Sequence, residues 1–462
     1  MSGLRDTVQT KLADAGLQEA LGRALASSNA KLETALSELD DVPALKDAAA
    51  EIRRHAVGRM WQLLETFEAR LRDAGTTVLW ARDATDVRRY IAEICSVHKV
   101  SKTVLSKTMV GEELGLEQSI KDAGSSVIQS DVGERIIQLA QQSPSHIILP
   151  CIHLRAADVG KILHERGRMP YSEDPAELSR GLGKSLRQHF LGAHMGVSGA
   201  NFLVAETGNI VCVENEGNIR MGYSVPPVHV VVTGVEKILP TLADARLLLA
   251  LLPRLATGQR ATCYTSILGP APLPGQSRYV ILVDNGRSDL FGAGPCRDLL
   301  HCIRCGACLN VCPVYQRVGG HAYGWTYPGP IGTAMASMLA PDEAVESLSL
   351  CTLCGACSEV CPVRIPLDRL ILLGRATARA RRKASEVRQE RRALRWFRRA
   401  MSGRVRYRMS DWGHRLGLAW WGGRVAAMQE KLGWRGERAA PEPAPQLFRT
   451  WWSGRRKRGD LK

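Results

Sequence analysis

The sequence of 462 residues contains no long hydrophobic run. Its richest apolar stretch, Leu247–Leu252, has six residues and ends at Pro253, whereas a transmembrane helix needs about 20. The N-terminal residues MSGLRDTVQTKLADAG contain no apolar segment of the kind that a secretory signal carries. We therefore expect neither a membrane-spanning helix nor a signal peptide.

Nucleotide-binding and nucleophile motifs are also missing. No G-x-G-x-x-G follows an expected strand, and no Walker A loop occurs. The local sequence does not suggest a Ser/His/Asp or Cys/His grouping. The sequence thus contains no complete active site of these kinds, and its catalytic residues, if any, are unknown.

Eight of the thirteen cysteines form two copies of the pattern C-x-x-C-x-x-C-x-x-x-C-P. Bacterial two-cluster ferredoxins bind 4Fe-4S clusters with this run, and its fourth cysteine serves the other cluster. We therefore expect two 4Fe-4S clusters with crossed ligands. The first cluster is assigned to Cys302, Cys305, Cys308 and Cys361, and the second to Cys351, Cys354, Cys357 and Cys312.

Two other uses of these cysteines fit the pattern less well. A disulfide framework is typical of short secreted chains. Zinc sites usually offer paired C-x-x-C motifs or Cys/His mixtures, without a third cysteine in register and a trailing proline. Oxygen-sensitive thiolate clusters and five further cysteines indicate a reducing cytoplasm.

The net charge of +16 is concentrated near the C-terminus. Residues 374–462 contain 25 Lys and Arg against 7 Asp and Glu, together with seven of the ten tryptophans. Such a tail is able to bind nucleic acid, to lie on an anionic membrane surface, or to wrap a partner subunit. We expect a partner or the inner face of a membrane rather than nucleic acid, because low-potential clusters need docking partners.

Strands and helices alternate in the middle of the chain, which predicts an α/β domain with a largely parallel sheet. Residues 1 to about 75 have helical apolar spacing. The expected strands are 76–81, 103–108, 125–130, 145–152, 209–215, 228–234 and 279–285. The strands 209–215 and 228–234 are expected without an intervening helix.

The expected domains follow from this pattern. The segment between the two cysteine runs is long enough for about two helices. We therefore expect a helical ferredoxin module. The domains are an N-terminal helical segment (1–70), an α/β domain (71–290), a two-cluster ferredoxin-type domain (291–373) and a basic, Trp-rich C-terminal region (374–462).

The sequence resembles the lactate utilization protein B family. Members of this family are the iron–sulfur subunit of a three-protein L-lactate oxidation system. The segments that carry the resemblance are 101–116, 131–153, GANFLVAETGNIVCVENEGNIR (199–220), 226–242, 283–290, CIRCGACLNVCPVY (302–315) and YPGPIG (327–332). The resemblance implies that the α/β domain is a LUD domain with a fold similar to the NagB/RpiA/CoA-transferase superfamily. It also implies two partners, a cysteine-rich CCG-domain protein and a second LUD-domain protein.

Polar turns on both sides of the strand IVCV form a candidate substrate or partner site. Loops at strand ends often carry function, although the same residues are good turn formers. Two lysines could bind a carboxylate, and a histidine follows an expected strand; as single residues these are more often surface or structural groups. The candidates are Glu206, Thr207, Asn215, Glu216, Asn218, Lys102, Lys107 and His153.

These observations predict an electron-transfer subunit of a system that oxidises L-lactate to pyruvate, rather than a complete enzyme. The first alternative is an iron–sulfur subunit for another 2-hydroxy acid, such as glycolate. The second alternative is an iron–sulfur protein that binds nucleic acid, which rests on the composition of the tail alone.

Overall fold

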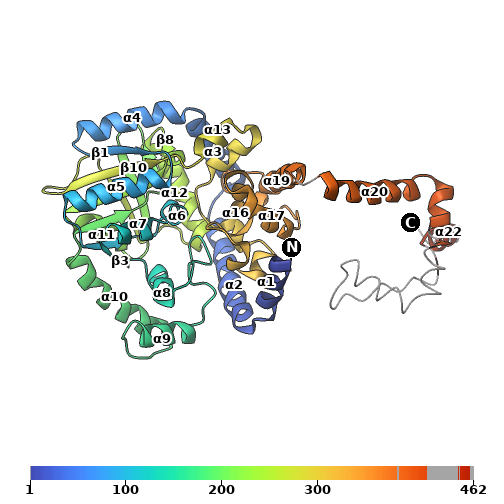
Figure 1. The fold of residues 1–462 in the computed structure, drawn as a ribbon, viewed down its shortest axis with the longest axis horizontal. Helices are drawn as coiled ribbons and strands as arrows, with labels where there is room; N and C mark the ends of the chain where they lie inside the picture. The colour runs from blue at the N-terminus through green and yellow to red at the C-terminus, as the bar shows by residue number, and fades with distance from the viewer. Residues whose placement is uncertain (1, 382–383, 411, 414–445, 447, 458–462) are drawn as a thin grey trace. The chain divides into compact units, whose positions relative to one another are not determined.

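The computed structural model describes residues 2–381, 384–410, 412–413, 446 and 448–457 (Figure 1). Its contacts divide the chain into two units, Met1–Ala378 and Arg379–Lys462, and each is described by itself. Three tryptophans of the tail and the PEPAP segment lie outside the described residues. They are Trp420, Trp421, Trp434 and residues 441–445.

Helices open the chain, as predicted for residues 1 to about 75. They are α1 (Ser2–Ala13), α2 (Ala15–Ser37), α3 (Val42–Gly58) and α4 (Met60–Asp73). Asp14 and Asp41 cap α2 and α3, because each carboxylate accepts a hydrogen bond from a backbone N–H of the first turn. Leu21, Met60 and Phe67 point from these helices into the main hydrophobic core.

A six-stranded sheet forms the centre of the first unit, and all of its neighbouring strands are parallel. The prediction of an α/β domain with a parallel sheet is confirmed. In spatial order the strands are β1 (Thr77–Ala81), β10 (Ser277–Val283), β7 (Val228–Gly234), β4 (Met195–Ser198), β2 (Lys102–Leu105) and β3 (Ser126–Gln129).

Helices and a second sheet cover the two faces of this sheet (Figure 1). Successive strand residues alternate between separate cores, as Leu105 and Val104 do. One face is covered by α5 (Ala84–Val97), α6 (Met109–Glu113) and α7 (Leu116–Asp122). The other is covered near β2 and β3 by α8 (Val132–Ala140), α9 (Ala156–Glu165) and α10 (Pro175–Leu191).

Near β1, β10 and β7, that second face packs against a smaller sheet and the N-terminal helices. The smaller sheet has the order β8-β5-β6-β9, with β5 and β6 forming an antiparallel hairpin. Its elements and neighbours are β5 (Phe202–Val204), β6 (Asn209–Glu214), α11 (Asn218–Ser224), η1 (Val235–Lys237), β8 (Ile238–Leu239), α12 (Leu242–Thr257) and β9 (Tyr264–Leu268).

One predicted strand does not form, and one predicted connection between strands was wrong. Residues 145–152 form bends and turns, because their polar groups bind the cysteine-rich region: the Ser145 carbonyl accepts a hydrogen bond from Tyr315 Oη at 2.6 Å. Residues 209–215 and 228–234 are separated by α11 and lie in different sheets. The seven-residue helix α11 was missed because its sequence NIRMGYS has no clear apolar periodicity.

The cysteine-rich region is helical, and no strand follows β10 in the part of the chain that the structure describes. Its elements are α13 (Arg287–Gly292), η2 (Gly294–His301), α14 (Ala307–Asn310), α15 (Tyr315–Val318), η3 (His321–Tyr323), α16 (Gly329–Leu339), α17 (Pro341–Leu350), α18 (Ala356–Val360) and α19 (Leu367–Arg381). The second unit includes α20 (Ala384–Met401) and α22 (Phe448–Lys457). None of the described helices combines the length and apolarity that crossing a bilayer requires.

Candidate metal centres and an adjoining cavity

The two cysteine motifs fold into matching backbone turns. Arg304 and Leu353 occupy equivalent positions with φ of 61° and 58°. Their N–H groups donate to the preceding cysteine sulfurs, Cys302 Sγ at 3.4 Å and Cys351 Sγ at 3.3 Å. The glycines that follow, Gly306 and Gly355, also have positive φ, which glycine adopts without steric cost. Each motif therefore wraps three thiols around a tight turn.

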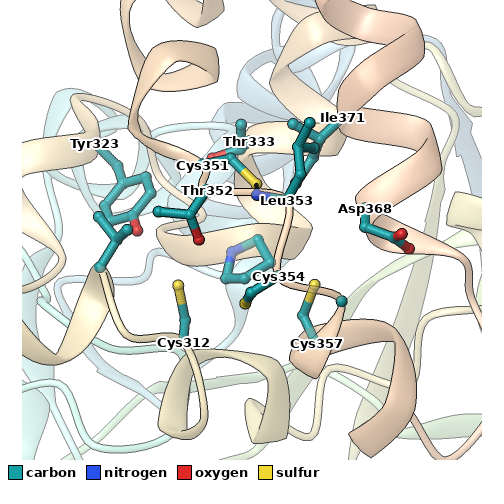
Figure 2. Close-up of a pocket in the computed structure, with 13 residues that line it drawn as sticks. Cys312, Tyr323, Thr333, Cys351, Thr352, Leu353, Cys354, Cys357, Asp368 and Ile371 are labelled. Atoms are coloured by element: carbon teal, nitrogen blue, oxygen red, sulfur yellow. Dashed lines mark hydrogen bonds between the residues drawn. The ribbon is translucent and has the colours of Figure 1, made fainter. Parts of the chain in front are cut away.

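Cysteines from both motifs line one small cavity of about 20 Å³ near the surface (Figure 2). Three come from the second motif and the fourth is Cys312 of the first. We call these four residues the surface set: Cys312, Cys351, Cys354 and Cys357. Cys354 is exposed and Cys357 is buried. Burial raises the pKa of the Cys357 thiol to about 12, and the nearby Cys351 adds to this shift.

The remaining four motif cysteines gather deeper in the protein, and their thiolate charges interact with one another. We call them the interior set: Cys302, Cys305, Cys308 and Cys361. Three of the four are buried. Burial raises the pKa of Cys361 to about 11 and that of Cys308 far above its ordinary value. Isolated thiolates are costly at such a site unless positive charge is bound nearby.

Each donor set consists of four cysteine thiols, which is the ligand chemistry of a 4Fe-4S cluster. All thirteen cysteines are free thiols. Nowhere in the described chain do three His, Cys, Asp or Glu side chains converge closely enough to hold one metal ion. A tetrahedral zinc site would bring its sulfurs to within about 4 Å of each other, whereas a cubane binds each thiolate to a different iron atom and spaces them more widely.

Buried cations surround the interior set. Arg53 is 1% exposed and donates hydrogen bonds to four backbone carbonyls, those of Glu236, Ile238, Leu300 and His301. Burial lowers the pKa of Arg53 to about 10 and that of Lys237 to about 8. The charges of Arg53, Lys237 and Arg304 all interact with the Cys302 thiolate.

A buried ion network joins these cations to the α/β domain. Arg287 is fully buried and pairs with Glu113 at 2.7 Å and with Glu236 at 2.9 Å. Arg304 approaches Glu236 at 3.6 Å, and its guanidinium lies 4.6 Å from the ring centre of Tyr327. Residues of both predicted domains therefore share one charged core.

A larger cavity of about 300 Å³ lies at the carboxyl ends of the parallel strands. Lys107 follows β2, Asp131 follows β3, Asn201 follows β4, and Thr233 lies at the end of β7. Ligands of open α/β sheets bind at this edge of the sheet. Arg304 of the first cysteine motif also lines the cavity. This strand-end cavity thus extends from the α/β domain to the interior set.

Half of the predicted site residues line the strand-end cavity: Lys107, Asn215, Glu216 and Asn218. Lys107 forms an ion pair with Glu134. Asn218 is buried, and its Nδ2 donates to Ser130 Oγ at 3.4 Å.

Glu216 exposes part of its surface, and its carboxylate accepts a hydrogen bond from the Val132 N–H at 2.9 Å. Partial burial of that carboxyl, followed by the charge of Asp131, raises the pKa of Glu216 to about 7.

The other half lie elsewhere. Glu206 and Thr207 belong to the turn of the β5–β6 hairpin, whereas Glu216 follows the opposite end of β6. A six-residue strand separates its ends by roughly 20 Å. Lys102 begins β2, at the opposite edge of the sheet from Lys107.

His153 lies in a third place. Its Nε2 is 2.8 Å from Gln142 Oε1, and its ring packs against His321. Burial lowers its pKa to about 4. These contacts place His153 outside the lining of the strand-end cavity.

Sequence reasoning missed most of the residues that line the strand-end cavity, among them Asp131, Thr233, Lys237 and Arg304. Asp131 and Thr233 could have been found, because each stands at the carboxyl end of a correctly predicted strand. Lys237 and Arg304 gave no such signal, since one lies in a short 3₁₀ turn and the other inside the cysteine motif.

Comparison with known proteins gives matches over both regions. Residues 64–279 match the LUD domain family, and residues 298–365 match the 4Fe-4S dicluster domain family. The chain is 36% identical to the uncharacterised electron transport protein YkgF of Escherichia coli K12, over 96% of this chain and 95% of that protein. It is 36% identical to lactate utilization protein B of Shouchella clausii, over 99% and 98% of the two chains. Lactate utilization protein B of Bacillus cytotoxicus is 34% identical, over 96% of each chain.

Proposed function

Since the chain belongs to the lactate utilization protein B family, we propose that it is the iron–sulfur electron-transfer subunit of a multi-protein system that oxidises L-lactate to pyruvate. The observation that carries this proposal is the sorting of eight motif cysteines into two crossed sets of four. One set is buried beside a cavity and the other reaches the surface, as an electron carrier between two partners requires.

The proposal includes two 4Fe-4S clusters in a helical ferredoxin-type module. The interior set would hold one and the surface set the other. Bound there, each cluster supplies one-electron transfer. The chain's own residues tune the sites: the Arg304 and Leu353 N–H groups donate to thiolate sulfurs, and the apolar core excludes water from the interior set.

Lactate is favoured over glycolate because two of the relatives are named for lactate utilization. Electron transport is favoured over nucleic-acid binding because another relative is named for it. The proposed partners are a cysteine-rich CCG-domain protein and a second LUD-domain protein. Loss of the gene should abolish growth on L-lactate and spare growth on glycolate; the reverse result would favour the alternative substrate.

Metal analysis tests the cluster assignment directly. Anaerobically purified protein should contain about eight iron and eight sulfide per chain. Because the ligands cross, Cys361→Ser should remove the EPR signal of the interior cluster although Cys361 lies in the second motif. Cys312→Ser should remove the signal of the surface cluster. Loss of the opposite signal in each variant would refute the crossing.

For the basic tail, we propose contact with a partner subunit or with the inner face of the cytoplasmic membrane. Four of its described tryptophans are partly or largely exposed: Trp396, Trp412, Trp451 and Trp452. Arginine with exposed tryptophan suits both surfaces. Removing residues 380–462 should leave the iron content unchanged and abolish binding to the partners or to anionic vesicles. Retention of both kinds of binding would contradict this role.

A further inference from the structure

Two buried side chains that line the strand-end cavity, Thr233 and Arg304, have polar atoms without a hydrogen-bond partner, and the buried Lys237 lines the cavity with them. Thr233 is 1% exposed and Arg304 is 8% exposed, and both Thr233 Oγ1 and Arg304 Nε have no hydrogen-bond partner. Lys237 is 6% exposed. Opposite charge reaches its ammonium from Glu236 and from Cys302. Native proteins rarely leave buried polar groups unmatched, so Thr233 and Arg304 together indicate a missing partner.

The charges at this end are those of an anion site. The nearest carboxylate, Glu236, already pairs with Arg287 at 2.9 Å and lies 3.6 Å from Arg304. Glu236 Oε1 itself has no hydrogen-bond partner, so this carboxylate does not saturate the Arg304 guanidinium. The Arg304 guanidinium also donates to Met335 Sδ at 3.1 Å, which neutralises none of its charge.

We infer that the strand-end cavity binds a small monocarboxylic acid, with its carboxylate between Lys237 and Arg304 and its 2-oxygen at the Thr233 hydroxyl. Both cations are charge-assisted donors suited to a carboxylate. The identity of the acid as lactate or pyruvate rests on the proposed function, whereas the anion site rests on the residues alone.

The rest of the cavity limits the ligand to a single negative charge. Asp131, Glu214 and Glu216 line the same cavity. Their carboxylates oppose phosphate, sulfate and dicarboxylates through like-charge repulsion. Apolar side chains such as Val232 and Leu252 complete the wall, and these suit a methyl group.

The position of this site links it to the interior set. Arg304 donates its backbone N–H to Cys302 Sγ at 3.4 Å. The charges of Lys237 and Arg304 interact with the Cys302 thiolate. An acid bound to these two cations therefore brings negative charge next to Cys302, and added negative charge lowers the reduction potential of a cluster.

Calorimetry on the full-length protein with pyruvate and with L-lactate tests the binding. Lys237→Met should weaken binding at least about tenfold, because it removes a charged donor. The matched control is Lys184→Met, which removes an exposed lysine of α10 and should leave affinity unchanged. Thr233→Val should remove the preference for L-lactate over propionate, which lacks the 2-oxygen. Sulfate should bind more weakly than either acid.

The second measurement is an EPR redox titration of the interior cluster with and without pyruvate. The acid should shift the midpoint to lower potential in the parent protein and in Lys184→Met, and not in Lys237→Met. A tenfold difference in affinity between the oxidised and reduced states corresponds to about 59 mV.

Three outcomes would overturn the inference. They are no binding of either acid, unchanged affinity in Lys237→Met, and binding that leaves the interior cluster unaffected. Calorimetry detects acid binding whether or not a cluster is present. The acid-binding site and the proposed function can therefore be refuted independently of each other. Protein that binds the acid but lacks iron would refute the proposed function alone. Protein that holds iron but binds no acid would refute only this inference.

Discussion

The interior and surface sets have the same backbone turns and different surroundings. Arg304 and Leu353 occupy equivalent positions, yet Arg304 is buried in an ion network and Leu353 is 37% exposed. The duplicated motif therefore determines the backbone turn that positions the thiols. Residues outside the motif, above all Arg53, Lys237 and Glu236, determine the electrostatic environment of the interior set.

This contrast also separates two tasks. The interior set borders the strand-end cavity through Arg304, whereas the surface set includes the exposed Cys354. A change near the interior set should affect the stability of the protein and any bound acid. A change near the surface set should affect mainly electron exchange with a partner.

The largest expected effect comes from removing one ligand of each set. Cys308→Ser should reduce iron to about half or less and lower the melting temperature, because Cys308 is buried in the core. Cys354→Ser should also halve the iron and leave the melting temperature almost unchanged. Cys263→Ser, at an exposed cysteine outside both sets, should change neither. Equal destabilisation by the first two variants would contradict the difference between the sets.

A large loss of stability is expected from Arg53→Met. Four carbonyls lose their shared donor, and we expect a destabilisation of about 3–5 kcal/mol. The matched control is Arg54→Met, since the Arg54 side chain is 63% exposed; this change should stay within about 0.5 kcal/mol. Denaturant unfolding under anaerobic conditions measures both. Similar losses in the free energy of unfolding for the two variants would mean that the hydrogen bonds of Arg53 do not stabilise the protein.

Exchanging the residues at the equivalent turn positions should move the two midpoint potentials unequally. Arg304→Leu removes a buried positive charge worth roughly 1–2 kcal/mol to a nearby cluster, so the interior midpoint should fall by about 40–90 mV. Leu353→Arg adds a charge that solvent screens, and the surface midpoint should rise by less. EPR redox titration resolves the two. A larger shift in Leu353→Arg would reverse the comparison.

The smallest expected effect concerns the acidic end of the strand-end cavity. The pKa of Glu216 is raised from its ordinary 4.5 to about 7. Glu216 therefore ionises more readily in the unfolded chain. Its contribution should reduce stability as the pH rises from 4.5 through 7, with little further change above about pH 8.

In Glu216→Gln, the free energy of unfolding should no longer fall between pH 5 and 8. The urea concentration at the midpoint of unfolding, measured across this pH range, tests this. The EPR spectrum of the interior cluster should stay the same in this variant. A parallel decline in the variant would show that Asp131 or Glu214 causes it instead.

The sequence predicted features that depend on local pattern. Six of the seven expected strands form, and in the five that belong to the large sheet apolar residues alternate between two buried faces. The grouping of Cys312 with the second motif followed from the motif itself. Four of the eight candidate site residues line the strand-end cavity, because the turn at Asn215–Asn218 and Lys107 both follow strand ends.

Features that depend on distant partners were not predicted. Residues 145–152 are apolar enough for a strand, but His146 Nε2 lies 3.1 Å from Asn310 Oδ1 and the Ser145 carbonyl binds Tyr315. Tertiary hydrogen bonds thus override local propensity. Lys237 could not be identified either, because only the fold brings it beside Arg304 and a cavity.

The exchange of Cys312 and Cys361 between the motifs has a consequence for biosynthesis. The surface set is complete only when the ribosome has made residue 357, and the interior set only when it has made residue 361. Of the eight motif thiols, a nascent chain that ends at Leu350 would hold only the four of the first motif, and one of these belongs to the surface set. Iron delivery to this protein should therefore begin late in translation, after both motifs can meet.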